Sequence, residues 1–295
     1  MLNNSAKLRF NSQFSKKNYI FVVLFNPNWV EMEPTATPIR LTFLGTGTSQ
    51  GVPVIGCNCE VCRSIDKRDR RLRTSAMIEL RNRRFIIDAG PDFREQMLRE
   101  DVSHITAILL THKHKDHIGG LDDVRALNFV DYPKAVHTVH IYASADTCDR
   151  VRKDYDYAFA KNPYRGVPQM LLHEFENAPF EVDGVEIIPI RGEHSRFEIT
   201  GFRFGNLAYL TDFKHISEEE CAKLQGVKVL VINALRFEPH DSHFSVAEAL
   251  EVVAKVKPER TYLTHMSHDI GLHCQANQQL PEGVEFAYDG LKIEL

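Results

Sequence analysis

The segment between Thr111 and His117 constrains this chain more than any other part of the sequence. It holds three histidines and one aspartate in the spacing H-x-H-x-D-H, directly after the apolar run 105–110. Histidine and carboxylate side chains are common ligands of zinc and similar divalent metals. A strand that ends in so many ligands has little structural use for them. The spacing therefore indicates a hydrolytic metal centre with two metals.

A centre with two metals needs about six or seven protein ligands, because each catalytic ion takes about three. Three further candidates each follow an apolar strand later in the chain: His194, Asp212 and His265. A single histidine in such a place is more often a packing or surface residue. Together with the H-x-H-x-D-H segment, their position and order make them candidate ligands. Two such ions lower the pKa of bound water, so hydroxide becomes available near neutral pH.

Predicted strands and helices alternate from residue 39 onward, and a pattern of hairpins followed by helices occurs twice. We expect hairpin turns at Asp183-Gly184, at Gly205-Asn206 and, near the C-terminus, at Asp289-Gly290. A helix is expected over 118–129. A second helix is expected over 245–256, with Ser245 as its N-cap. This pattern predicts two sheets packed face to face with helices outside, and a site along one rim.

The ordered series of candidate ligands resembles the motif of the metallo-β-lactamase superfamily. The series is His112, His114, Asp116, His117, His194, Asp212 and His265. The resemblance implies an α/β fold, a four-layer αβ/βα sandwich in which two mixed β-sheets carry helices on their outer faces. It also implies that His112, His114 and His194 hold one metal.

The same resemblance implies that Asp116, His117 and His265 hold the second metal. Asp212 would bridge the two metals together with a hydroxide. An aspartate in this position is typical of the phosphodiesterase and glyoxalase branches, whereas the hydrolytic lactamases often carry cysteine there. Asp88 matches an aspartate that the superfamily places beneath the ligands, where it would orient one of them.

A second motif, C-x-C-x-x-C, places Cys57, Cys59 and Cys62 in a loop rich in turn residues. Thiolates so close together fit a tetrahedral zinc site that lacks one ligand. The residues that could complete it are His268, His273 and Cys274. With six cysteines and no signal-peptide cleavage site, the chain is expected in a reducing, cytoplasmic setting.

A narrower resemblance combines the segment LGTGTSQGVP at 44–53, the three cysteines and THMSH at 264–268. Together they resemble the PhnP-type cyclic phosphodiesterases over about residues 39–295. The resemblance implies that His268 completes a structural zinc site. It implies two divalent metals, zinc or manganese, in the catalytic site, a small phosphodiester as substrate, and a homodimer as a candidate assembly. His243 matches a histidine that faces the substrate before a helix and would act as general acid, with His240 as the alternative.

Three other functions compete with a small-molecule phosphodiesterase. A ribonuclease Z-like nuclease would need an RNA-gripping surface, and the formal net charge of -4 argues against nucleic acid as a partner. A non-hydrolytic PqqB-like protein of cofactor biosynthesis would carry a similar cysteine triad but an eroded metal motif. A thiol-ester or lactam hydrolase fits the cysteine motif poorly. The intact metal motif argues against the PqqB-like alternative.

The first 37 residues differ in kind from the rest of the chain. Their apolar run, residues 19–25, is far shorter than the roughly 20 residues that cross a bilayer, so no membrane anchor is expected. We expect residues 1–37 to be a poorly ordered extension, with Met32 as a candidate start. A single hydrolase domain is expected over 38–295. The remaining histidines, including His104 and His137, have no context that indicates a metal site.

Overall fold

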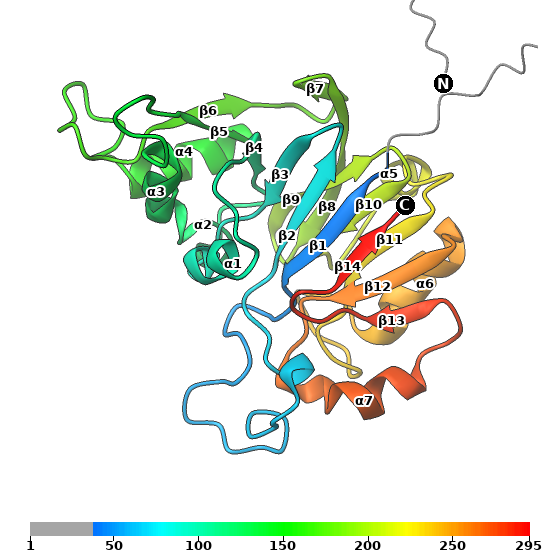
Figure 1. Ribbon diagram of the computed structural model, residues 1–295. Helices are drawn as coiled ribbons and strands as arrows, with labels where there is room; N and C mark the ends of the chain where they lie inside the picture. Colours follow the sequence, from blue (N-terminus) through cyan, green and yellow to red (C-terminus); the bar gives the residue numbers. More distant parts are fainter. Residues whose placement is uncertain (1–37) are drawn as a thin grey trace, which may run out of the picture. The chain divides into compact units, whose positions relative to one another are not determined.

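The computed structural model describes residues 38–295, so the expected N-terminal extension lies outside the described residues. Two seven-stranded sheets form the body of this part of the chain (Figure 1). The first sheet has the order β14-β1-β2-β3-β4-β5-β6, with β1 Arg40–Gly45, β2 Ser75–Leu80, β3 Arg83–Ile87, β4 Ala107–Leu109, β5 Val139–Ala143, β6 Met170–Glu174 and β14 Lys292–Glu294. The second has the order β13-β12-β11-β10-β9-β8-β7, with β7 Phe180–Val182, β8 Val185–His194, β9 Phe197–Phe204, β10 Leu207–Leu210, β11 Val229–Asn233, β12 Arg260–Thr264 and β13 Val284–Phe286.

Both sheets are mixed, and they change direction in the same way. Strands β1, β2 and β3 are antiparallel, whereas β3 to β6 are parallel. In the second sheet, β7 to β10 are antiparallel and β10 to β13 are parallel. The repeated pattern of hairpins and helices predicted from the sequence is therefore confirmed. Because the parallel strands of each sheet end at one rim, the residues that follow them gather there.

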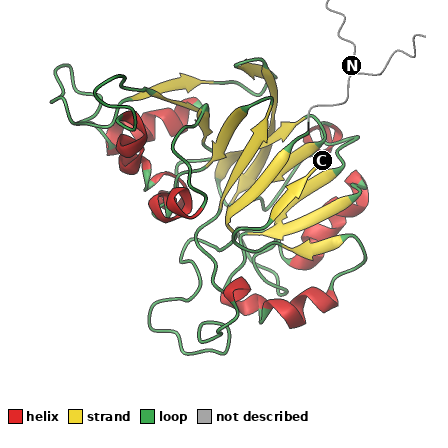
Figure 2. Cartoon of the chain, in the orientation of Figure 1, coloured by secondary structure: helices red, strands yellow, loops and turns green. Residues whose placement is uncertain are grey.

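Helices cover the outer face of each sheet (Figure 2). Their bounds are α1 Phe93–Arg99, α2 Lys115–Ile118, α3 Val124–Asn128, α4 Ala145–Asp154, α5 Glu218–Ala222, α6 Val246–Val256 and α7 His273–Ala276. Three buried apolar clusters separate the layers. One lies between the sheets and includes Phe43, Phe85 and Phe204. The other two pack α1, α3 and α4 on the first sheet and α5, α6 and α7 on the second. This arrangement confirms the four-layer αβ/βα sandwich.

Local turn and cap chemistry behaves largely as the sequence predicts. The hairpins at Asp183-Gly184 and Gly205-Asn206 connect β7 to β8 and β9 to β10. Both Asp183 and Gly184 have positive φ, as a tight hairpin turn requires. Helix α6 starts after Ser245, whose hydroxyl accepts from the Glu248 N–H while the Glu248 carboxylate accepts from the Ser245 N–H. Within the described residues, no helix is both long and apolar enough to cross a membrane.

The predicted hairpin at Asp289-Gly290 is wrong. Strand β13 pairs with β12 in the second sheet, whereas β14 pairs with β1 in the first, so the turn passes from one sheet to the other. The Asp289 carboxylate accepts hydrogen bonds from Thr46 and from the Leu72 N–H, at 2.8–2.9 Å. These buried bonds hold the turn against the 46–74 loop and prevent the two strands from pairing with each other.

The predicted helix over 118–129 is also wrong in its start and its continuity. Helix α2 begins at Lys115 and ends after one turn at Gly119, and α3 follows only from Val124. The glycines lie against the loop after β3, where a Cβ on Gly120 would meet the Gly90 carbonyl oxygen at 2.0 Å. Such close backbone contact is possible only without a Cβ, and it holds α2, which carries Asp116 and His117, against the loop after β3.

Gly90 provides the reciprocal contact, because a Cβ there would meet the Asp116 carbonyl oxygen at 1.9 Å. We predict that Gly90→Ala destabilises the protein by about 3 kcal/mol, since neither backbone can yield without moving α2. It should also lower the bound metal, measured by elemental analysis beside thermal unfolding. Gly184→Ala is the matched control. Its added Cβ meets no atom within 4 Å, so the variant loses stability only because alanine disfavours the positive φ of +79°. Equal metal content in the two variants would contradict this reading.

Candidate metal centre

The structure brings all seven predicted catalytic ligands to one rim of the sandwich. His112 and His114 follow β4, and Asp116 and His117 lie in α2. His194 is the last residue of β8. Asp212 follows β10, and His265 follows β12. Their ligand atoms form two groups, each within 4.8 Å: His112, His114 and His194 in one, and Asp116, His117, Asp212 and His265 in the other. This grouping is the one that the superfamily resemblance implies.

The first group consists of three imidazoles that pack edge to face, with interplanar angles of 63–76°. His112 Nε2 lies 3.0 Å from His114 Nδ1, and the rings of His114 and His194 are 5.1 Å apart between centroids. His194 Nδ1 lies 2.7 Å from the carbonyl oxygen of Ser242, to which it donates. This bond leaves Nε2 of His194 with its lone pair directed into the group. Burial holds the pKa of His112 well below its usual range, so this imidazole is neutral.

The second group is organised around the carboxylate of Asp212, which is almost fully buried. Its Oδ2 lies 3.3 Å from His117 Nε2, and its Oδ1 lies 3.0 Å from His265 Nε2. Asp116 Oδ2 lies 3.1 Å from the same nitrogen of His117. Burial alone would lower the pKa of His117, but Asp212, Asp116 and Asp88 outweigh it and raise that pKa well above its usual range. The position between these carboxylates thus favours a cation.

Asp88 lies beneath the second group and fixes two of its neighbours. Its Oδ2 is 2.7 Å from His117 Nδ1 and accepts from the Thr111 hydroxyl at 2.8 Å, while Oδ1 accepts from the Thr111 N–H. The Nδ1–H of His117 is therefore directed to Asp88, which leaves Nε2 facing Asp116 and Asp212. Thr111 is a residue that sequence reasoning missed. Its position directly before His112 is the only signal that could have found it.

Three residues of the centre have a left-handed backbone. The φ angles are +62° at Asp88, +65° at Asp212 and +59° at His265, and each residue lies one or two positions after the end of a strand. For a residue other than glycine this conformation costs roughly 1 kcal/mol, and strain of this kind clusters at functional sites. The turn aims each side chain back toward the rim. Aspartate and histidine are among the residues other than glycine that adopt this conformation most often.

The donor set fits a pair of divalent metal ions. Within residues 38–295, His117 Nε2 and both ring nitrogens of His265 are buried without a hydrogen bond, and the two Nε2 atoms face carboxylate oxygens at 3.0–3.3 Å without hydrogen-bond geometry. A buried polar atom without a partner costs about 1–3 kcal/mol. A metal ion would use the lone pair on each Nε2. The histidines and carboxylates of the two groups accommodate zinc and manganese alike.

The cysteine motif forms a separate site. The Sγ atoms of Cys57, Cys59 and Cys62 lie 3.4, 3.3 and 3.7 Å from His268 Nδ1. In a tetrahedral zinc site with one nitrogen and three sulfur ligands, such atoms are about 3.6 Å apart. The N–H of Cys62 donates to the Cys59 sulfur, which lowers the pKa of Cys59 to about 6 and favours the thiolate. These contacts fit one closed zinc site.

The other two residues considered for this site lie elsewhere. The backbone N–H of His273 bonds to the buried Asp69, and Cys274 is exposed. A buried guanidinium joins the segments on either side of the site. Arg71 donates to the carbonyl oxygens of Ser267 and Gly271, at 2.7 and 3.1 Å. The cysteine loop and the segment that carries His268 are therefore held together by the ligands and by Arg71.

His243 lies beside the second group, and His240 does not contact it. His243 Nε2 is 3.1 Å from Asp212 Oδ1, and its Nδ1 is 2.9 Å from the Ser242 hydroxyl. His240 bonds only to Ser242, through the hydroxyl and the backbone N–H. Burial lowers the pKa of His243 to about 4 although the bond to Asp212 acts in the opposite direction. The imidazole is therefore neutral at pH 7 before any substrate binds.

Comparison with known proteins agrees with this geometry. Residues 83–266 match the sequence profile of the Beta-lactamase superfamily domain. The chain therefore belongs to the metallo-β-lactamase superfamily, whose members are mostly metal-dependent hydrolases. It is 42% identical to a diphosphatase of the PhnP family, with a TM-score of 0.81 over 88% of this chain and 97% of that one. Within the superfamily, the chain accordingly belongs to the PhnP family.

Other similar proteins have different named activities, and one is about twice as long as the matched part of this chain. An octanoyltransferase from Porphyromonas gingivalis is 39% identical over 257 residues, which are 86% of this chain but 51% of the relative. The chain thus spans about half the length of that protein. A ribonuclease Z from Pyrobaculum islandicum is 25% identical over 78% of this chain and 87% of its own length. Zinc-bound PqqB from Methylobacterium extorquens has a TM-score of 0.70 over 87% of this chain and all of its own, but at 18% identity it shows the fold alone.

We predict that Cys59→Ser lowers the zinc content by about one ion per chain and reduces the yield of soluble protein. The closed site holds one ion, and its loss separates the cysteine loop from His268. Elemental analysis of the purified protein measures the change. Cys274→Ser is the matched control, because this cysteine is exposed and lies outside the site. An unchanged zinc content in Cys59→Ser would contradict the assignment of a structural zinc site to these cysteines.

Proposed function

We propose that this protein is a metal-dependent phosphodiesterase that hydrolyses small, including cyclic, phosphodiesters. The observation that carries the proposal is the carboxylate of Asp212, which belongs to the second ligand group and also lies within 4.8 Å of His194 of the first, in a chain that also has the cysteine and His268 site. Similarity to a PhnP-family diphosphatase supports the same class of substrate. The ions are two zinc or manganese ions at the two ligand groups and one structural zinc.

The charge of the centre suits an anionic ester. Two divalent ions would lower the pKa of water toward neutrality and neutralise the phosphoryl oxygens. Three carboxylates, those of Asp116, Asp212 and the underlying Asp88, would oppose the four positive charges of the ions, so the loaded centre would keep a net positive charge before water loses a proton. A phosphodiester carries one negative charge and is held more strongly there than a neutral lactam or thiol ester.

His243 is placed to protonate the leaving oxygen. Its Nε2 contacts Asp212, and its ring stacks on His265 with centroids 4.8 Å apart, so it faces the same space as the ligands. A bound phosphodiester brings a negative charge next to this ring. That charge favours the imidazolium, the form that donates a proton to an alkoxide. Ser242 holds the other ring nitrogen and fixes the orientation of the ring.

A ribonuclease Z-like function receives less support. The stretch where an RNA-gripping arm would lie, 124–194, folds into α3, β5, α4, β6, β7 and β8. The net charge of -4 also favours a small ester over a polyanion. Acyl transfer, the activity that names the Porphyromonas gingivalis relative, is not proposed, because about half of that protein lies outside the match.

The first test replaces ligands of the centre. His112→Ala and Asp116→Ala should each reduce hydrolysis of bis(p-nitrophenyl) phosphate at least about 100-fold, because loss of an outer partner of a ligand alone costs 10–100-fold. Both proteins should keep a native circular dichroism spectrum. Asp149→Asn, on the exposed surface of α4, serves as the matched control and should keep full activity. Full activity in His112→Ala or Asp116→Ala would contradict the assignment of these residues to the catalytic centre.

The second test concerns the proton donor. His243→Ala should reduce hydrolysis of a 2′,3′-cyclic nucleotide by about 10²–10⁴-fold, because its alkoxide leaving group needs a proton. The same variant should lose far less activity toward bis(p-nitrophenyl) phosphate, since nitrophenolate leaves without one. The ratio of the two losses, from kcat/KM values, is the measurement. Equal losses on both substrates would assign His243 to positioning Asp212 instead.

A further inference from the structure

A third group of potential ligands lies away from the catalytic centre. His104 Nε2 and His137 Nε2 lie 3.0 and 2.7 Å from the same oxygen of Asp131, Oδ2. The two rings are nearly perpendicular, at 81°, with centroids 5.5 Å apart. His104 lies in the loop before β4 and His137 just before β5, whereas the catalytic histidines follow the other end of β4. This group, the His104–Asp131–His137 cluster, is therefore at the opposite end of the strands.

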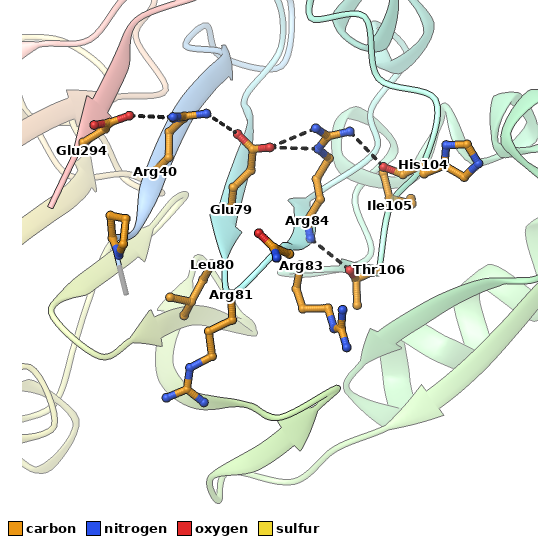
Figure 3. Close-up of a pocket in the computed structure, with 12 residues that line it drawn as sticks. Arg40, Glu79, Leu80, Arg81, Arg83, Arg84, His104, Ile105, Thr106 and Glu294 are labelled. Carbon is orange, nitrogen blue, oxygen red and sulfur yellow. Dashed lines mark hydrogen bonds and ion pairs between the residues drawn. The ribbon is translucent and has the colours of Figure 1, made fainter. Parts of the chain in front are cut away.

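The backbone of each member is fixed from the inside of the protein. The fully buried Asn128 donates to the carbonyl oxygen of His137 at 2.7 Å and accepts from the His137 N–H through its own carbonyl at 2.9 Å. The Asp131 carbonyl accepts two backbone bonds in the turn that follows α3. Arg84 donates to the carbonyl oxygen of His104, and the ring of His104 extends away from that arginine (Figure 3). The backbone positions of the three residues are thus set before any ligand binds.

One hydrogen bond can also leave the coordinating nitrogen of His104 available. Ser103 Oγ lies 3.0 Å from His104 Nδ1 and can accept its N–H, which leaves the lone pair on Nε2, the atom that faces Asp131. The spacing of 2.7–3.0 Å resembles that of the catalytic ligands, where His265 and Asp212 are 3.0 Å apart. Half of each side chain is open to solvent, so an ion could enter and keep water in its remaining positions.

We propose that the His104–Asp131–His137 cluster is a binding site for a divalent transition-metal ion of the zinc type. Two imidazoles and one carboxylate are ligands that such ions prefer, whereas magnesium prefers oxygen ligands alone. The ion would join the α1–β4 loop to the α3–β5 loop, across 27 residues of sequence. Its role is to clamp the two loops, and it takes no part in the hydrolysis proposed above.

The test counts ions in the full chain, dialysed against a series of buffered free Zn²⁺ concentrations. Wild type should reach one more zinc per chain than Asp131→Asn. Without an ion, each Nε2 can carry the ring proton and donate to residue 131. Asparagine keeps an oxygen that accepts from both of these N–H groups but removes the anionic ligand, so it separates metal binding from simple hydrogen bonding. Hydrolysis of bis(p-nitrophenyl) phosphate should be the same in both proteins, which shows that the variant is folded. Mg²⁺ in place of Zn²⁺ should give no difference.

Crystals grown with zinc give a second measurement. An anomalous peak between His104, Asp131 and His137 at the zinc edge would support the proposal, and His137→Gln should remove it while the catalytic peaks stay. Equal zinc counts in wild type and Asp131→Asn at every concentration would overturn it. The cluster would then be a pair of imidazole–carboxylate hydrogen bonds. This outcome leaves the phosphodiesterase proposal untouched, because the Asp131 variant does not alter the catalytic centre.

Discussion

One buried carboxylate joins the two halves of this protein. Asp212 follows β10 in the second sheet, yet it lies 3.3 Å from His117, which belongs to α2 beside the first sheet. From its own half it contacts His243 and His265, at 3.1 and 3.0 Å. A buried charge is costly unless it is paired or bound to a metal. Asp212 therefore needs both halves in place, and the rim of the sandwich is built around it.

Strain and close packing near Asp212 follow from the same requirement. Three residues of the centre hold a left-handed backbone, and Gly90 and Gly120 allow α2 and the β3 loop to touch backbone to backbone. Each of these features costs stability in the isolated segment. They persist because the hydrogen bonds of Asp88 and the three buried apolar clusters fix the surrounding structure. The fold thus supplies the rigidity that a metal centre needs.

The clustering of the seven candidate ligands could be predicted from the sequence, because four of them lie within six positions and the others each follow a recognisable apolar strand. The same holds for the cysteine motif. By contrast, the sequence around Asp289-Gly290 does not show that β13 and β14 join different sheets. That arrangement depends on hydrogen bonds from Thr46 and Leu72 to Asp289, across more than 200 residues. The His104–Asp131–His137 cluster was missed for a similar reason. Its members carry no local spacing signal and meet only when two loops are brought together by β4 and β5.

Proteins with this fold have several different activities, so the activity depends on the residues of the site. The same sandwich is found in a diphosphatase, in ribonuclease Z and in PqqB, at identities from 42% down to 18%. A shared fold therefore says little about the substrate. In this chain, the identity of the residue at position 212, the histidine at 243 and the closed cysteine site carry the information that the fold does not.

The pairing of β14 with β1 has a consequence for the order in which the protein can assemble during synthesis. Strand β1 is the first strand of the described domain to leave the ribosome, and its outer edge is covered only by β14, about 250 residues later (Figure 1). Until then the edge of β1 presents unpaired backbone groups, which is where aggregation starts. Contacts of such long sequence separation also form slowly. Completion of the first sheet therefore waits for the second, and the domain closes only after nearly all of it has been made.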